Sequence, residues 1–181
     1  VSINHNKKVL TIIPNSYRID ETGSDAEVTS YSSSVSASDV DVNVVSTNKE
    51  TGKVVLTEAE LVVSAGRGLK GAENWGMIEE LADTLGAATA CSKPVSDMEW
   101  RPHSEHVGQT GITIKPNLYI AVGISGAIQH LAGVGSSKVI CVVNTDPEAP
   151  FFKAADYGIV GDAFDVVPRL LKRAKEIKGL S

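Results

Sequence analysis

The sequence is poor in aromatic residues, cysteine, positive charge and long apolar runs. Aromatic residues make up 5% of its 181 residues, and no apolar run reaches the roughly 18 residues that a membrane-spanning helix needs. Acidic residues outnumber basic ones by 22 to 17, which argues against generic binding to nucleic acid or to an anionic membrane surface. Residues 1–15 lack the long apolar run and small-residue cleavage site of a secretory signal. We therefore expect a protein that is not membrane-embedded and that does not bind nucleic acid.

The two cysteines, Cys91 and Cys141, each lie in a short apolar run. Neither belongs to a CxxC motif or to a Cys/His spacing that is typical of a metal site. This pattern favours buried free thiols in a reducing compartment over a disulfide or a metal pair. We predict no metal ligands.

The chain changes character near residue 58. Residues 1–57 are polar and rich in Ser, Thr, Asp and Val, with β patterns at residues 8–13 (KVLTII) and 35–45 (VSASDVDVNVV). This β-rich segment has too little apolar content to fold alone, so we expect it to pack on the rest of the chain or on a partner. Residues 58–181 form the second predicted domain.

From residue 58 onward, short apolar segments alternate with helical patterns. The predicted strands are 60–64, 88–91, 118–125, 138–144 and 157–161, and the predicted helices are 71–86, 126–133 and 166–179. Pro168 is expected in the first turn of the last helix, where its missing N–H costs little. Apolar strands that alternate with helices predict an α/β fold, in which a doubly wound, mainly parallel sheet is covered on both faces. The N-terminal β segment would be added to this Rossmann-like domain.

Ligands of such sheets bind beyond the carboxyl ends of the strands, and each notable loop follows a strand. The first loop, GRGLKG at residues 66–71, matches G-x-G-x-x-G between a strand and a helix, which is the context of a dinucleotide site. An NAD site would require Asp or Glu at the end of the next strand, where Ser92 and Lys93 stand instead. Lys93 could accept the phosphate of NADP, so an NADP-binding oxidoreductase module is an alternative.

Two further loops carry uncharged polar groups. Ser125 and Gly126 lie where a strand turns into a short helix, whose positive end favours a phosphate. The loop HVGQTG, residues 106–111, offers neutral donors and acceptors that suit a flat heteroaromatic ring. Either loop could instead be an ordinary turn, and His130, in the short helix, could either face a ligand or cap a carbonyl.

Three other polar residues have two interpretations each. Asn144 and Asp162 follow the fourth and fifth predicted strands, where they could contact an adenosine or simply form turns, which both residue types favour. Arg67 could pair with a phosphate or be an ordinary surface residue. Five predicted loops follow the five strands, at residues 64–71, 92–97 (SKPVSD), 123–130, 144–150 and 161–164, and together they suggest a long site for a long ligand.

Four stretches together resemble the alpha subunit of electron-transfer flavoprotein, across its FAD-binding C-terminal domain. They are VVSAGRGLKGAENW (62–75), HVGQTG (106–111), LYIAVGISGAIQHLAG (118–133) and VVNTDPEAPFFKAADYGIVGD (142–162). The resemblance covers about residues 58–175 and continues more loosely over KVLTIIPNSY. Most of the family's N-terminal domain has no counterpart, so the chain looks like a C-terminal fragment with a remnant of that domain.

The resemblance implies FAD in an extended groove and an electron carrier, not an enzyme. Such a carrier pairs with a beta subunit and shuttles electrons from acyl-CoA-type dehydrogenases of fatty acid oxidation to a membrane quinone reductase or another acceptor. It implies a cytoplasmic location, or the mitochondrial matrix in a eukaryote. A second alternative is a scaffold whose groove stays empty because the rest of the subunit is missing.

The resemblance also implies roles for individual residues. Gln109 and Thr110 would lie beside the isoalloxazine, His130 near its C2 carbonyl, and Asn144 and Asp162 at the adenosine. The full set of implied FAD contacts is Arg67, Ser92, Lys93, His106, Val107, Gly108, Gln109, Thr110, Ser125, Gly126, Ala127, Ile128, Gln129, His130, Asn144, Asp162 and Ala163.

Two positions depart from the family pattern. Lys93 stands where Arg is usual, and His106 stands where Gln is common. Both lie where the flavin potential is tuned, so the family's potential does not transfer to this chain.

Overall fold

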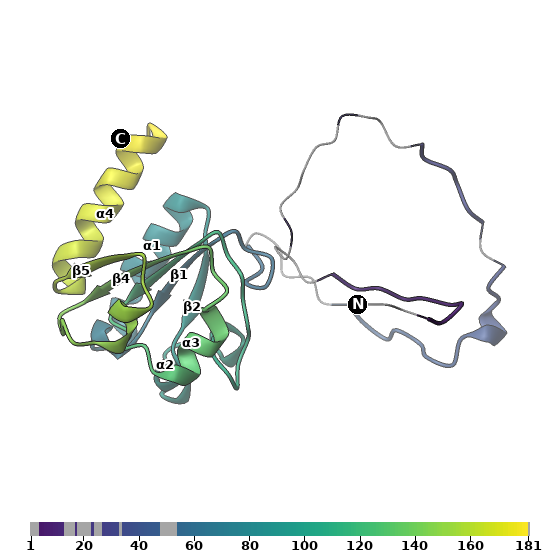
Figure 1. Ribbon diagram of the computed structural model, residues 1–181, viewed down its shortest axis with the longest axis horizontal. Helices are drawn as coiled ribbons and strands as arrows, with labels where there is room; N and C mark the ends of the chain where they lie inside the picture. The colour runs from purple at the N-terminus through teal and green to yellow at the C-terminus, as the bar shows by residue number, and fades with distance from the viewer. Residues whose placement is uncertain are drawn as a thin grey trace. The chain divides into compact units, whose positions relative to one another are not determined.

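The structure, a computed structural model, describes residues 4–12, 17, 23, 27–32, 34–47 and 54–180. The chain divides into two units, one of Arg18–Lys53 and one of Val1–Tyr17 with Val54–Ser181. All strands of the described residues belong to the second unit (Figure 1). The predicted domain boundary at residue 57 stays a prediction.

Five strands form one parallel sheet, and four α-helices accompany it. The strands are β1 (Leu61–Ala65), β2 (Ala88–Cys91), β3 (Leu118–Val122), β4 (Val139–Asn144) and β5 (Tyr157–Val160). The helices are α1 (Gly76–Leu85), α2 (Lys93–Asp97), α3 (Ile128–Val134) and α4 (Ala163–Lys178). Short 3-10 turns are η1 (Ala37–Asp39), η2 (Arg67–Leu69), η3 (Ala72–Asn74), η4 (His103–Glu105) and η5 (Pro150–Lys153). Within the described ranges, no helix has the length and apolarity needed to cross a membrane.

The strand order is β2-β1-β3-β4-β5, with every neighbouring pair parallel. The chain leaves β1 toward β2 on one side and returns to β3 on the other. The boundary between β1 and β3 is therefore the topological switch point, where open α/β sheets bind their ligands. The predicted doubly wound α/β fold is confirmed.

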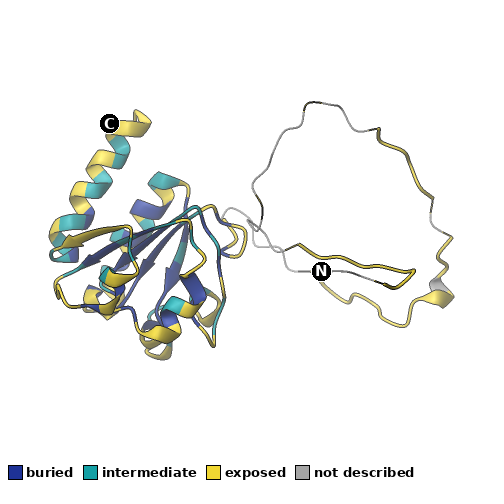
Figure 2. Cartoon of the chain, in the orientation of Figure 1, coloured by how far each residue is buried: buried dark blue, intermediate teal, exposed yellow. Residues whose placement is uncertain are grey.

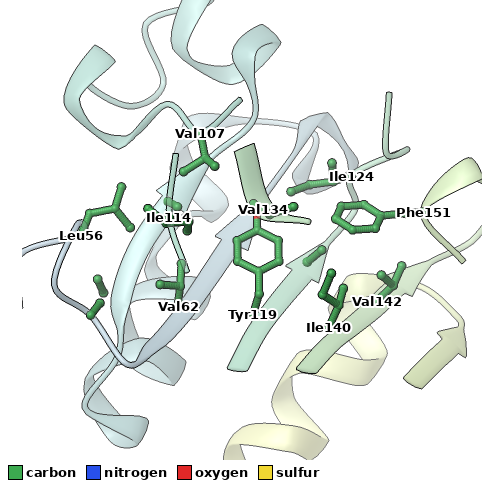
Figure 3. Packing of buried hydrophobic residues seen from close by; sticks show 14 residues of the cluster. Leu56, Val62, Val107, Ile114, Tyr119, Ile124, Val134, Ile140, Val142 and Phe151 are labelled. Atoms are coloured by element: carbon green, nitrogen blue, oxygen red, sulfur yellow. The ribbon is translucent and has the colours of Figure 1, made fainter. Parts of the chain in front are cut away.

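Successive residues of β1 and β3 serve two cores, because side chains of a strand alternate between faces. Val63 and Ile120 pack with α1 and α4 on one face. Val62 and Tyr119 pack on the other face, under α3 and the segments that contain Val107, Ile114 and Phe151 (Figure 3). The two cores explain why β1 and β3 are apolar throughout.

The two long helices begin at positions other than those predicted. α1 starts at Gly76, five residues after the predicted start, because the 3-10 turn η3 occupies the intervening residues. It ends at Leu85, and Gly86, the predicted stop, is its C-cap with a φ of 72°. α4 starts earlier, at Ala163, because the Asp162 carboxylate accepts a hydrogen bond from Phe164 N at 3.0 Å. Pro168 consequently lies in the second turn of α4, not in the first.

The expectation that every strand is covered on both faces is wrong for β5. All four of its residues are exposed, as the edge strand in Figure 2 shows. An edge strand has one neighbour only, and α4 packs mainly on α1.

Both cysteines are free, as predicted. Burial is complete for Cys91, raising the pKa of its thiol to about 12, and partial for Cys141.

The predicted N-terminal strands are not formed in the described residues. Residues 8–12 and 40–45 have no regular structure and are exposed (Figure 2), and Ile13 lies outside the described residues. The predicted strand at 35–45 contains only the 3-10 turn η1, whose capping contacts join Ser36 to Asp39. A strand requires a neighbour to accept its ladder hydrogen bonds, and a favourable residue pattern does not supply one.

Candidate cofactor-binding site

A cavity of about 800 Å³ lies at the carboxyl edge of the sheet, around the switch point. This volume falls in the range of about 300–1,000 Å³ that is typical of ligand sites. A second cavity of about 300 Å³ shares Arg67, Gly68, Gly123 and Asn144 with the first, so the two adjoin as parts of one elongated groove.

Most of the predicted site residues line this groove. The large cavity is lined by Arg67, Ser92, Lys93, His106, Val107, Gly108, Gln109, Thr110, Ser125, Ala127, Gln129, His130 and Asn144, and the small one also by Asp162 and Ala163. Gly126 and Ile128 line neither cavity: Gly126 is backed against Phe151, and the Ile128 side chain is exposed. The prediction missed Gly68, Pro94, Asp97, Gly123 and Ile124 in the large cavity.

The glycines of the GRGLKG loop hold two loops together at the switch point. Gly66 N donates to Val122 O at 2.9 Å, and Gly68 N donates to Gly123 O at 3.1 Å. A Cβ atom on Gly68 would lie 2.6 Å from the Gly123 Cα, which no real side chain tolerates. The motif does not open a helix directly, since α1 begins only at Gly76, so the predicted dinucleotide context is wrong in that respect.

The turn before α3 presents a row of free backbone donors. The N–H groups of residues 125–129 make no hydrogen bond within the described part of the chain. Ser125 O accepts from Phe151 N at 3.0 Å, which holds the turn in place. Gly126 has a φ of 82° and leaves no room for a Cβ beside Phe151. Successive free N–H groups at a helix start favour an anion, and Ser125, Ala127 and Gln129 of this turn line the cavity.

Arg67 provides a second group that suits an anion. It is exposed at the start of η2 and lines both cavities. Its guanidinium makes no ion pair or hydrogen bond with the other described residues. An uncommitted guanidinium has five donors available for phosphate oxygens.

Lys93 lines the cavity and forms an ion pair with Asp97. The segment SKPVSD, predicted as a loop, is helix α2, which begins at Lys93 after the N-cap Ser92. Lys93 Nζ lies 3.0 Å from Asp97 Oδ1, one turn later, and both side chains are half-exposed cavity residues. Asp97 could have been found from the sequence, because an i,i+4 pair shares one helix face.

The loop at residues 106–111 is fixed between β2 and α3. Val107 N donates to Cys91 O at 3.1 Å, and Gln109 N donates to Gln129 O at 2.7 Å. His106 and Val107 are buried, while Gln109 and Thr110 are exposed on the cavity wall. The loop therefore presents neutral polar side chains to the cavity, as predicted from their types.

His106 and His130 are both buried cavity residues, exposed by 2% and 6% respectively. Burial lowers the pKa of His106, and the neighbouring His103 and Lys93 lower it further. Burial lowers the pKa of His130 to about 4, with a further contribution from His106. Both rings are therefore neutral at pH 7, and the Nδ1 atom of each is buried without a hydrogen-bond partner among the described residues.

His130 is the third residue of α3, and its ring reaches into the core beneath the cavity. Its Nε2 and the Tyr119 hydroxyl are 2.8 Å apart, and the Phe151 ring packs edge-on with a centroid distance of 5.7 Å. Tyr119, at the centre of Figure 3, is fully buried. His130 thus joins the cavity wall to the core.

Asn144 and Asp162 use their side chains to shape the groove. Asn144 donates to Ile124 O at 3.0 Å and accepts from Asp146 N at 3.0 Å. Besides capping α4, Asp162 accepts a hydrogen bond from Lys70 Nζ at 3.2 Å. Its pKa is lowered, first by the Phe164 N–H and then by Lys70. Both residues therefore have the structural roles that their types suggest, at the wall of the groove.

These features define a class of protein. A doubly wound parallel sheet, a groove at its switch point, free amides, an uncommitted Arg67 and neutral polar side chains are typical of an α/β domain that binds a nucleotide cofactor.

Comparison with known proteins gives a family match for part of the chain. Residues 55–135 match the electron transfer flavoprotein FAD-binding domain. Electron transfer flavoprotein subunit alpha of Thermoanaerobacterium thermosaccharolyticum is 46% identical over 155 residues, which are 85% of this chain and 47% of that protein. The Bacillus subtilis subunit is 45% identical over 92% of this chain and 52% of its own length. The mitochondrial subunit of Dictyostelium discoideum is 54% identical over 72% of this chain and 37% of its own length.

Residues 55–135 therefore belong to the electron transfer flavoprotein family, and the chain is related to its alpha subunits. The chain spans about half the length of the first two of these relatives, and less of the third.

Proposed function

We propose that this chain is the FAD-binding part of an electron-transfer flavoprotein alpha subunit. In this proposal it pairs with a beta subunit and carries electrons from acyl-CoA-type dehydrogenases to a quinone reductase or another acceptor, in the cytoplasm or the mitochondrial matrix. One observation carries the proposal. Residues 125–129 have free N–H groups, and Ser125, Ala127 and Gln129 of this turn line the same groove as the uncommitted Arg67 guanidinium, which suits a diphosphate between two ring systems.

The residues present fit FAD along the groove. Arg67 and the amides of residues 125–129 would hold the diphosphate. Gln109 and Thr110 would donate and accept hydrogen bonds at the flavin, in the larger cavity. Asp162 and Ala163 would contact the adenosine in the smaller cavity.

Bound FAD would supply the one- and two-electron chemistry, and the protein would bind, orient and tune it. His130 stays neutral at pH 7 because its pKa is about 4, and Tyr119 holds its Nε2 atom. His106 adds a second buried neutral imidazole to the same wall. Lys93 contributes a positive charge that Asp97 offsets.

FAD and NADP binding to the purified chain, with and without the beta subunit, tests this function. We expect flavin absorbance to co-purify or to be restored by added FAD. Arg67→Gln should weaken FAD binding by about tenfold or more, because a charge-assisted hydrogen bond is lost. Arg169→Gln is the matched control, because Arg169 is exposed on α4 and makes no ion pair or hydrogen bond with the described residues. Binding of NADP without FAD, even with the beta subunit present, would overturn the proposal.

A further inference from the structure

Arg101 is the centre of a half-buried cluster of side chains that do not line the cavity. Its Nε and Nη2 donate to the two carboxylate oxygens of Glu105 at 2.8 and 2.6 Å, and its Nη1 donates to Glu79 Oε1 at 2.8 Å. Its guanidinium also lies over the Trp75 ring, 5.4 Å from the centroid. Arg101 therefore joins α1, which contains Glu79 and follows Trp75, to the segment that ends in Glu105.

The cluster differs from the other ion pairs of the described residues in its burial. Arg101 and Glu105 side chains are exposed by 15% and 16%, whereas Arg173 in its pair with Glu176 is exposed by 73%. The hydrogen bond with Glu105 is the largest cause that raises the pKa of Arg101. Two-point contacts between Arg and a carboxylate fix geometry in addition to charge, and removing one partner of a buried pair leaves the other uncompensated.

Glu105 directly precedes the loop that lines the cavity. It is the last residue of η4, and His106 follows it as the C-cap of that turn. Downstream, two backbone hydrogen bonds hold the loop: Val107 N donates to Cys91 O, and Gln109 N donates to Gln129 O. Upstream, Arg101 is the side chain that attaches it to α1. The loop is thus anchored at both ends, and only the upstream anchor consists of side chains.

We propose that Arg101 is a positioning residue that holds residues 103–110 against α1, so that His106, Gln109 and Thr110 stay on the cavity wall. It does not line the cavity itself. Its effect on FAD binding rests on the proposed function, whereas its effect on the loop does not.

Amide hydrogen exchange of the unliganded chain tests the positioning role directly. The reporters are the loop amides of Val107, Gln109 and Gly111, which are hydrogen-bonded, and the amides of β1 and β3 serve as the core reference. We expect Arg101→Met to accelerate exchange of the loop amides by more than about tenfold relative to the core, as the loss of charge-assisted hydrogen bonds implies. Arg101→Lys should have a smaller effect, because lysine keeps the positive charge and loses only the two-point contact with the Glu105 carboxylate.

Arg173→Met is the control variant, since it removes an exposed ion pair of the same type. It should leave loop and core exchange unchanged. If Arg101→Met does not fold, Glu105→Gln, which keeps the side-chain shape, replaces it. Unchanged loop exchange, or equal acceleration at loop and core, would overturn the proposal, because the second result describes global stability only.

Affinity for FAD, measured on the same variants with the beta subunit present, adds the functional consequence. Arg101→Met should raise the dissociation constant by about tenfold, the factor for about 1.4 kcal/mol, while Arg173→Met leaves it unchanged. An unchanged dissociation constant with a loosened loop would refute the link to the cavity. If the parent protein binds no FAD, the proposed function fails, and the exchange result still decides the loop.

Discussion

Protonation of His130 should make the fold sensitive to acid. The ring is buried between Tyr119 and Phe151, and its Nδ1 atom has no hydrogen-bond partner in the described structure. Burial, aided by His106, lowers its pKa from the ordinary 6.5 to about 4. Below pH 6.5, the unfolded chain therefore takes up a proton that the folded chain refuses.

The sign and size of the effect follow from this difference. The stabilising contribution of the neutral ring is complete above pH 6.5 and is lost as the pH falls toward the folded pKa. The gap between 6.5 and about 4 corresponds to about 3 kcal/mol, since each pH unit is worth about 1.4 kcal/mol. For a domain stabilised by about 5–15 kcal/mol, this loss is large.

Urea unfolding between pH 7.5 and 4 measures the effect in the parent and in His130→Gln. Gln keeps a partner for the Tyr119 hydroxyl and does not titrate. Carboxylates and His106 contribute to both curves, so the difference between the curves isolates His130. We expect the parent to lose about 3 kcal/mol more than the variant between pH 6.5 and 4. Parallel curves would refute the reasoning, and His5→Gln, at an exposed position, is a control that should follow the parent.

Three further predictions concern the groove. Lys93→Met should lower the flavin potential by about 10–40 mV, the range of an exposed charge interaction, and Asp97→Asn should raise it; redox titrations that agree within about 5 mV would contradict this. Asp162→Ala should weaken FAD binding by about tenfold in a flavin titration, while Asp162→Asn, which can still cap α4, should retain affinity if capping is the role that matters. Gly68→Ala should lower the free energy of unfolding by about 1–3 kcal/mol through overpacking. Its control Gly76→Ala, whose Cβ meets nothing within 4 Å, should not, and equal losses in urea unfolding would contradict the close approach of the loops.

The sheet and the site's location could be predicted because they depend on residue pattern and topology. The apolar runs of β1 and β3 fit two covered faces, and parallel strands necessarily bring their following loops to one edge. The pattern could not show that β5 is exposed. That strand is apolar like the others, and its exposure follows from its position in the sheet order, which depends on contacts between distant residues.

The hydrogen bonds and ion pairs of side chains in the candidate site were harder to predict from the sequence. Lys93 was predicted as a cofactor contact, but its ion pair with Asp97 was not predicted, because residues 92–97 were expected to form a loop and residues 93–97 form helix α2. The role of Arg101 could not be predicted, because Glu105 is four residues away outside any predicted helix and Glu79, 22 residues away on α1, meets Arg101 only in the folded chain. His130 lies in the cavity wall, and its hydrogen bond with Tyr119 could not be predicted, because it depends on how α3 packs on the sheet.

The paired glycines at the switch point separate the shape of the groove from its chemistry. Main-chain contacts join the loops that contain Gly66, Gly68 and Gly123. The relative position of these two loops therefore does not depend on any side chain that lines the groove. Residues such as Lys93 and His106 can consequently be exchanged in evolution without displacing the loops that surround them. Under the proposed function, a scaffold of this kind would allow single substitutions at these positions to change the flavin potential while the groove keeps its shape.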